Sequence, residues 1–319
     1  MLNVFFTVDV EIWCDGWEDI DRKFPEAFRR YIHGPTPRGG FGLPYQLDVL
    51  RDQGIGATFF VEPLFSTRFG PHPLEEIVHL VREGGQEVQL HLHTEWVDES
   101  REPLLEDCRR KRQHLFMFSR DEQRRLITIG LGLLRAAGAD AINAFRAGSF
   151  GFNVDTLRAL SASGIDFDSS YNATLFGPGS GVLSGRVVVE PVACEGVIEY
   201  PMAVFDDGTG LRHVQLAACS SAELESLLWQ ALERQRKAFV ILSHSFELLN
   251  QAKNRPDDIV VRRFRRLCAF LDRNRDSFRS CRFSGLTPDL PAEQPAPLTS
   301  GLWATGRRII EQAYRRRYR

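Results

Sequence analysis

Two patterns of apolar residues alternate along the first 285 residues. Short runs rich in β-branched and aromatic residues have the length of buried strands, and between them apolar residues recur every three or four positions, as on one face of a helix. We expect strands at residues 2–11, 56–62, 86–93, 142–148 and 238–243, with short β-like runs within 182–203. We expect helices at residues 43–54, 72–85, 120–137, 153–164, 220–236 and about 257–273.

This alternation predicts an α/β fold, because strands separated by helices usually form a parallel sheet covered by those helices. The pattern fits one barrel or one open sheet, and it contains no internal repeat. Residues 14–41 are charged and rich in Gly and Pro, so we expect an irregular segment. Such a long loop more often shapes a functional site than links two domains.

The sequence changes character after residue 286. Residues 287–300 contain four prolines, which favour an extended linker. Residues 301–319 interleave arginines with apolar residues, which predicts a basic amphipathic tail. Two alternatives stay open for this tail: an interfacial helix attracted to anionic lipid or an acidic partner, and a solvated tail or a helix packed on the domain. The predicted division is therefore a domain of residues 1–286, a linker and a tail.

Composition narrows the classes of function. With 40 basic and 42 acidic residues the net charge is −2, which does not favour a nucleic-acid partner. The six cysteines are scattered along the chain, which argues against a thiolate zinc site or a disulfide scaffold and favours reduced thiols. Acids interrupt the N-terminal apolar run at Asp9 and Glu11, so it resembles neither a signal peptide nor a membrane span. These features predict a cytoplasmic protein, with peripheral contact at the inner membrane face as an option for the tail.

Polar residues gather where the expected strands end, which is where ligands bind in α/β sheets and barrels. The ends carry Asp9 with Glu11, His91 with His93, Arg146, and His244. Residues two apart on a strand share a face, so each of the two pairs points one way. Any one of these residues alone would more often be structural. Their joint occurrence favours a site, and two imidazoles with a carboxylate form a common three-ligand metal set that leaves positions open.

The order of these motifs resembles the polysaccharide deacetylases, carbohydrate esterase family 4, which share the NodB-homology domain. The resemblance covers residues 2 to about 285. It implies a distorted (β/α)7-type barrel and a metal-dependent enzyme that removes acetyl groups from N-acetylated sugars. The family's five motifs correspond in order to Thr7–Val8–Asp9–Val10–Glu11, His91 onwards in "HLHTE", Arg146–Ala147–Gly148, Asp168, and Leu242–Ser243–His244, and "GATFFV" at 56–61 matches its second strand.

Three positions depart from the family pattern. Val10 stands where the family has a metal-binding Asp, and Glu11 is the plausible substitute. Glu95 stands where the family has its second His, so either His93 or Glu95 completes the site. Gly148 replaces a Pro. The expected ligands are Glu11, His91 and His93, with Glu95 and Asp9 as alternatives, and the expected metal is zinc, with cobalt, nickel, iron or manganese as other options.

The resemblance also implies roles for the remaining residues. Asp9 is expected to be the general base, held by Arg146, and Glu11 could exchange roles with it. His244 is the expected general acid, oriented by Asp168. Leu242 and Phe150 are expected to contact the substrate. Independently of the resemblance, Trp96 could stack on a sugar ring, although packing is the commoner role of such residues.

These expectations combine into a metal-dependent N-deacetylase that acts on an N-acetylated sugar, a glycolipid or a glycan precursor during biosynthesis. Two alternatives remain from the sequence. The same site could serve another amide hydrolase, such as a deformylase or a ureide hydrolase. The chain could also be a non-catalytic glycan-binding protein that kept the barrel and lost the metal.

Overall fold

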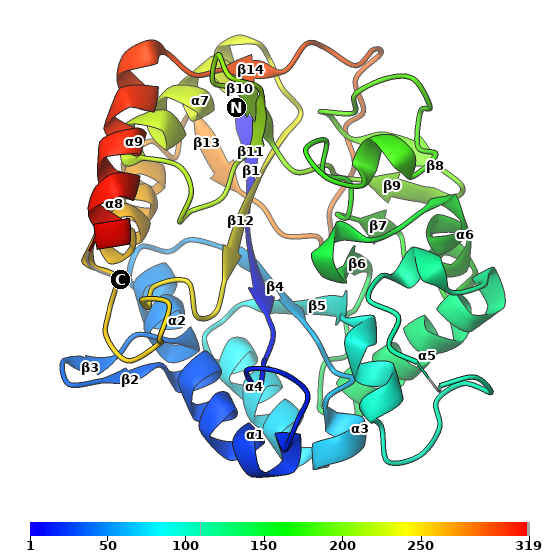
Figure 1. Ribbon diagram of the computed structural model, residues 1–319. Coiled ribbons are helices and arrows are strands. Elements are labelled where there is room, and N and C mark those ends of the chain that lie inside the picture. The colour runs from blue at the N-terminus through cyan, green and yellow to red at the C-terminus, as the bar shows by residue number, and fades with distance from the viewer. Residues whose placement is uncertain (109, 318–319) are drawn as a thin grey trace.

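A curled nine-stranded sheet forms the centre of the computed structural model, which describes residues 1–108 and 110–317 (Figure 1). Neighbouring strands along its path pair in parallel, apart from the antiparallel pair β8 and β9. The path runs through β12 (Ala238–His244), β1 (Leu2–Val10), β4 (Ala57–Val61), β5 (Glu87–Leu92), β6 (Ala144–Ala147), β7 (Phe167–Asp168), β9 (Val197–Glu199) and β8 (Val192–Cys194), and β13 (Phe278–Ser280) pairs with the start of β1.

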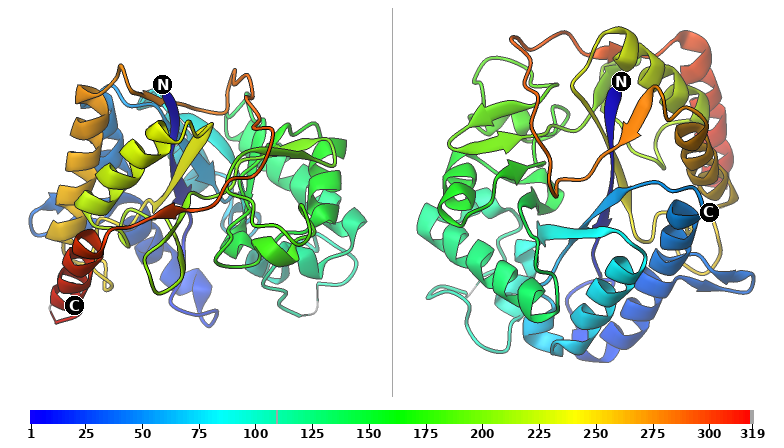
Figure 2. Two further views of the ribbon diagram at one scale, coloured as in Figure 1. Left: turned by 90° about the horizontal axis from the view of Figure 1, so that it is seen from above. Right: turned by 180° about the vertical axis from the view of Figure 1, so that it is seen from behind.

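Helices surround this sheet, as the view from above shows (Figure 2). Those that follow the expected pattern are α2 (Leu43–Asp52), α4 (His72–Glu83), α5 (Arg120–Ala136), α6 (Val154–Ala162), α7 (Ser221–Glu233) and α8 (Asp258–Arg273). Short turns of helix are α3 (Ser66–Phe69) and the 3₁₀ segments Thr94–Glu99, Leu115–Met117, Gly148–Phe150 and Gly177–Gly179. Capping boxes begin three of these helices, at Ser119, Asn153 and Ser220.

The α/β barrel expected from the sequence is confirmed, and the reason for its distortion is visible. Irregular chain between residues 200 and 216, not a further long strand, covers the open side of the sheet next to β12. The N–H of Ala203 donates to the carbonyl of Val240 at 3.1 Å, and the N–H of Leu216 donates to that of Leu242 at 2.9 Å. Part of this segment forms a small second sheet of β11 (Leu211–His213), β10 (Val204–Asp206) and β14 (Leu298–Thr299).

Residues 14–41, expected to be irregular, are largely ordered structure. They form α1 (Ile20–Phe28), a π-helix (Arg29–His33) and a hairpin of β2 (Pro35–Thr36) and β3 (Gly39–Gly40). The prediction was wrong because Ile20, Phe24 and Ala27 recur at helical spacing and are buried. Their burial stabilises the helix although Pro25 lies inside it and glycines flank it.

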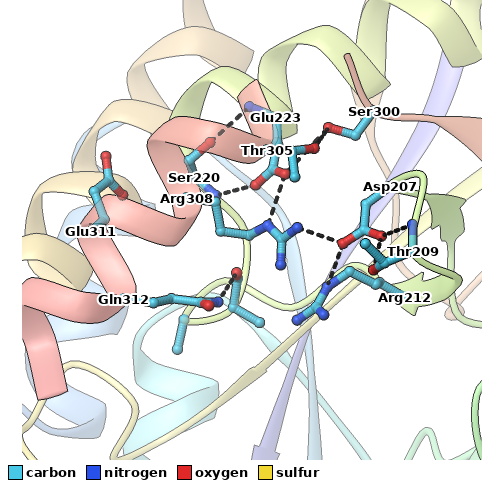
Figure 3. A network of polar contacts seen from close by, with 12 residues as sticks. Asp207, Thr209, Arg212, Ser220, Glu223, Ser300, Thr305, Arg308, Glu311 and Gln312 are labelled. Carbon is cyan, nitrogen blue, oxygen red and sulfur yellow. Dashed lines mark hydrogen bonds and ion pairs between the residues drawn. The ribbon is translucent and has the colours of Figure 1, made fainter. Parts of the chain in front are cut away.

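The helix α9 (Leu302–Arg317) packs against the domain, close to α7 and α8 (Figure 3). Arg308 is 3% exposed, and its Nη2 and Nε atoms donate to Asp207 at 2.5 Å and Glu223 at 2.9 Å. We call Arg308, Asp207 and Glu223 the α9 clasp. Arg263 of α8 also pairs with Glu311. Of the two alternatives for this segment, the structure shows the packed helix, whereas the division into domain, linker and tail stays a prediction.

The described helices include none whose length and hydropathy would let it cross a lipid bilayer.

Candidate active site

Strand register brings the predicted polar residues together at the carboxyl ends of four strands of the sheet. Asp9 on β1 lies directly opposite His244 on β12, and His91 on β5 lies opposite Arg146 on β6. Since β1 and β5 flank β4, all four side chains are placed at one end of the curled sheet. The alternating pattern of the strands, which the sequence displayed, therefore determines where these residues meet.

Three buried side chains at this end form a cluster with the composition of a metal site. One possible ligand atom from each of Glu11, His91 and His93 lies within 4.8 Å of the other two. The Nε2 atom of His93 is 2.5 Å from a carboxylate oxygen of Glu11, and that of His91 is 3.7 Å from the same oxygen. These are the three residues expected to be ligands.

The second nitrogen of each imidazole is held from behind. His91 Nδ1 donates to the backbone carbonyl of Arg146 at 2.8 Å, so Nε2 is the nitrogen that faces Glu11 and would bind a metal. His93 Nδ1 lies 3.3 Å from the carboxylate of Glu95. Such partners fix the tautomer and the orientation of metal-binding histidines. The donor set therefore fits a divalent metal, and the position of Glu95 behind His93 favours His93 as the ligand.

Gly148 is required by the approach of the backbone to His93. A Cβ atom at residue 148 would lie 2.7 Å from His93 Nδ1 and 2.6 Å from the carbonyl oxygen of Leu92. Neither contact is tolerated without movement of the site.

Opposite charges within the cluster shift the ionisation of its members. Burial raises the pKa of Glu11, but the neighbouring His93 and the hydrogen bonds from His91 and His93 outweigh burial and hold that pKa well below its usual range. Burial lowers the pKa of His93, and the carboxylates of Glu11 and Glu95 raise it well above its usual range. In the absence of a cation, a proton on His93 compensates the buried carboxylate.

Arg146 holds Asp9 in a fixed position. Its Nη1 atom donates to Asp9 Oδ1 at 2.6 Å, and its Nε and Nη2 atoms donate to the carbonyl and the hydroxyl of Ser169. The guanidinium also lies 4.3 Å from the ring centre of Phe60. With 0% exposure and contacts on every side, Arg146 has little freedom, and the Asp9 carboxylate is positioned with it.

His244 lies between two carboxylates. Its Nε2 is 4.0 Å from Glu11, and its Nδ1 is 3.9 Å from Glu247. Burial lowers the pKa of His244, but Glu247, Glu11 and Asp9 together raise it to about 9. The imidazole is therefore mostly protonated at neutral pH. Glu247 was missed from the sequence, where its only signal is an acid three residues after the histidine in "HSFE".

Asp168 has other neighbours. It accepts a hydrogen bond from Ser170 Oγ at 2.6 Å, and Ser170 in turn accepts from the N–H of Ala147 on β6. Burial raises the pKa of Asp168, and burial together with Asp168 raises the pKa of Glu199 well above its usual range, so the two share a proton. The carboxylate beside His244 Nδ1 is that of Glu247. The role expected of Asp168, to orient His244, stays a prediction.

Comparisons with known proteins support the architecture. No protein-family model matches the chain, and no curated protein matches it by sequence. A solved "putative polysaccharide deacetylase" from Mycobacterium smegmatis superposes with a TM-score of 0.54 at 20% identity, covering 92% of this chain and 94% of that one. The chain has the fold of the polysaccharide deacetylases.

Two further polysaccharide deacetylase folds are more distant. A family 4 carbohydrate esterase from Streptomyces lividans, solved with acetate, has a TM-score of 0.43 at 15% identity and covers 92% of this chain and 97% of its own. A family 4 pseudoenzyme from Bacillus anthracis has a TM-score of 0.40 at 13% identity and covers 85% of this chain and 61% of its own.

Within this fold, the residues expected to contact substrate have different surroundings. Leu242 and Phe150 are both buried in one apolar cluster, at 2% and 8% exposure. Phe150 and Ser149 have φ values of 58° and 51°, an unusual left-handed pair for residues with side chains, which fixes the turn after β6. Their contact with substrate stays a prediction.

Trp96 is enclosed by other aromatic rings. It is 1% exposed and packs against Trp17, Phe65 and Phe69. A ring enclosed in this way has no face for a sugar, so the expected substrate contact of Trp96 is not supported. Trp13, which is half-buried, has its ring centre 4.7 Å from that of His93 and borders the site instead.

Proposed function

We propose that this protein is a metal-dependent hydrolase that removes the acetyl group from an N-acetylated sugar during glycan or glycolipid biosynthesis. The observation that carries the proposal is the buried cluster of Glu11, His91 and His93 with Asp9 and His244 beside it. The fold supports it, since the cluster lies at the strand ends where barrel enzymes hold their catalytic groups.

The protein's own residues divide the work of amide hydrolysis. A divalent metal such as zinc, held by Glu11, His91 and His93, would acidify a water molecule and polarise the acyl carbonyl. Asp9, fixed by Arg146, takes the proton of the attacking water. His244, kept protonated by Glu247, gives its proton to the sugar nitrogen as the C–N bond breaks. Without that proton the amine would leave as an unstable anion.

A metal assay combined with a substrate panel tests the proposal. Purified protein should contain a divalent metal, and a chelator should abolish release of acetate from N-acetylated sugars until zinc is returned. Release of formate from formylated sugars, or hydrolysis of a ureide, would identify another amide hydrolase on the same site. Protein that binds no metal and releases neither acid would overturn the hydrolase and favour a glycan-binding protein.

We also propose a cytoplasmic location with peripheral contact between α9 and an anionic membrane. Two features support this contact. Ile309 and Ile310 are 56% and 71% exposed on α9, and the helix is rich in arginine. The α9 clasp holds the opposite side of the helix on the domain, which leaves the isoleucines facing outward.

A further inference from the structure

A cavity of about 960 Å³ adjoins the candidate active site. The loop between β12 and α8, the start of α8, and Arg315 of α9 line it. It meets the site through two residues: the ring of Phe246 is centred 5.3 Å from that of His244, and Glu247 faces His244 Nδ1. A molecule in this cavity would therefore lie beside the group proposed to protonate the leaving amine.

Basic side chains outnumber acidic ones around this cavity. The acids are Glu247, Asp257 and Asp258, and the basic residues are Arg38, Lys253, Arg255, Arg262, Arg265 and Arg315. Each acid is already engaged: Asp257 pairs with Arg315 at 2.7 Å, Asp258 pairs with Arg38 at 2.8 Å, and Glu247 faces His244. These pairings leave an excess of positive charge in the lining, although the whole protein is close to neutral.

Arg262 and Arg265 contribute most clearly to the excess. They lie three residues apart on α8, so they share one face of the helix. The Nε of Arg262 donates to the backbone carbonyl of Asp258 at 3.2 Å, and the Nε of Arg265 donates to the hydroxyl of Tyr45 at 2.6 Å. Both acceptors are neutral. Within residues 1–108 and 110–317, neither arginine forms an ion pair.

We propose that this cavity binds the diphosphate of a diphosphate-linked N-acylated sugar, the substrate class of the hydrolase proposed above, on which this inference rests. Two neighbouring guanidinium groups match two linked phosphates, since each can donate paired N–H groups to phosphate oxygens. The sugar would extend past Phe246 towards His244. The carrier beyond the diphosphate is either a nucleoside or a lipid, and the shared chemistry is the diphosphate itself.

Calorimetric titration with uridine diphosphate tests the cavity without any turnover. The variant is Arg262→Gln/Arg265→Gln, which keeps good helix formers on an exposed face. The control is Arg158→Gln, which removes one positive charge from α6 on the other side of the barrel (Figure 1). We expect the double variant to weaken binding about 100-fold, with about tenfold for each lost charged hydrogen-bonding group. The control should bind like the parent.

Two results of the titration would overturn the proposal. One is equal binding by the parent and the double variant. The other is binding that falls in His91→Ala but not in the double variant, which would place the diphosphate at the metal cluster and not in the cavity. Binding by the parent should also weaken as ionic strength rises, because the lining is partly exposed to solvent.

Acetate release from three N-acetylated substrates separates the two proposals and identifies the carrier. They are a neutral N-acetylglucosamine oligomer, a uridine-diphosphate sugar and a polyprenyl-diphosphate sugar. The cavity is supported if one diphosphate substrate has a higher kcat/KM than the neutral oligomer and if the double variant loses this advantage by a rise in KM. The preferred substrate then identifies the carrier. Activity on the neutral oligomer alone overturns the cavity and leaves the hydrolase standing. Diphosphate binding that depends on the two arginines, without hydrolysis of any substrate, overturns the hydrolase instead.

Discussion

Two of the buried clusters of charge in the described part of the chain are completed in different ways. The α9 clasp joins one arginine to two carboxylates, and its members are at most 4% exposed. The candidate metal cluster joins one carboxylate to two imidazoles, and its members are at most 8% exposed. Both clusters place ionisable groups where a lone charge would be very unfavourable.

The difference lies in what compensates the carboxylate. The guanidinium of Arg308 is permanently charged, so the clasp is complete with the protein's own atoms. Imidazoles can lose their protons, so the compensation of Glu11 can pass from the proton on His93 to a metal ion. A buried cluster built with arginine therefore fixes structure, whereas one built with histidine can accept a ligand.

The largest expected effect falls on catalysis without a matching effect on folding. His244→Ala should lower kcat/KM on an N-acetyl sugar by about 10²–10⁴, because the leaving nitrogen loses its proton donor. The loss should be much smaller on an activated aryl ester, whose leaving group needs no proton. Retained activity on amides, in a folded and metal-loaded variant, would show that His244 is structural.

A substitution in the α9 clasp should instead lower stability without a direct effect on the catalytic residues. Arg308→Met should lower the free energy of unfolding by about 3–5 kcal/mol, because Glu223 stays buried without a cation and Asp207 keeps only the partly exposed Arg212 at 3.6 Å. Urea titration measures it, and Arg29→Met, which breaks an exposed pair with Glu26, should cost far less. Adding Asp207→Asn and Glu223→Gln should restore part of the loss. Equal costs for the two arginines would mean that the clasp is not a distinct stabilising unit.

The support behind the metal cluster can be tested by its affinity for zinc. Glu95→Gln should weaken zinc binding about 10–100-fold, because the carboxylate that orients His93 Nδ1 is lost. Asp98→Asn is the matched control, since Asp98 also contacts Lys111 but does not touch His93. His93→Ala should cost more than Glu95→Gln. If His93→Ala keeps zinc and Glu95→Ala loses it, then Glu95 is the metal ligand and His93 the supporting residue.

A smaller effect is expected on pH dependence. His244 must be protonated to act as an acid, so activity should fall as the pH rises through its pKa of about 9. Glu247→Gln removes a carboxylate that raises this pKa, so the basic limb of kcat/KM should move to lower pH. Asp258→Asn removes a carboxylate from the same cavity and should leave that limb in place. If the basic limb of kcat/KM stays in place in Glu247→Gln, Glu247 does not set the pKa of the catalytic acid.

The smallest expected effect concerns the outer face of α9. Ile309→Ser/Ile310→Ser should weaken binding to anionic vesicles a few-fold, most visibly in a co-sedimentation assay at low salt. Ala313→Ser on the same helix is the control. These substitutions leave the α9 clasp intact. Removal of residues 301–319 would also take Arg308 away from Asp207 and Glu223. Unchanged vesicle binding would contradict the membrane contact.

The features that local patterns encode were predictable from the sequence. Short apolar runs of β-prone residues located β1, β5 and β12, and the polar residues at the ends of these runs, Asp9, His91 and His244, lie at one end of the sheet. The helix α1 also has apolar residues at helical spacing, but the glycines and prolines of residues 14–41 favour an irregular segment.

Features formed by distant segments were not predictable. The partners of Arg308 lie 85 and 101 residues away, so its spacing on an amphipathic helix could not show whether it faces acids or solvent. The role of Glu247 depends on the turn that brings it back to His244, where its N–H donates to the carbonyl of His244 at 3.1 Å. The basic cavity combines residues from Arg38 to Arg315, and only the folded chain places them together.

The position of β1 has a consequence for how the protein is made. This strand pairs with β4 on one side, but its other neighbour, β12, begins at residue 238. A ribosome adding about 5–20 residues per second needs roughly 10 to 50 seconds to reach it. For that time an apolar strand has an open edge of unpaired N–H and carbonyl groups, which is a surface for mispairing with other chains. We therefore expect the nascent chain to depend on chaperones until β12 emerges.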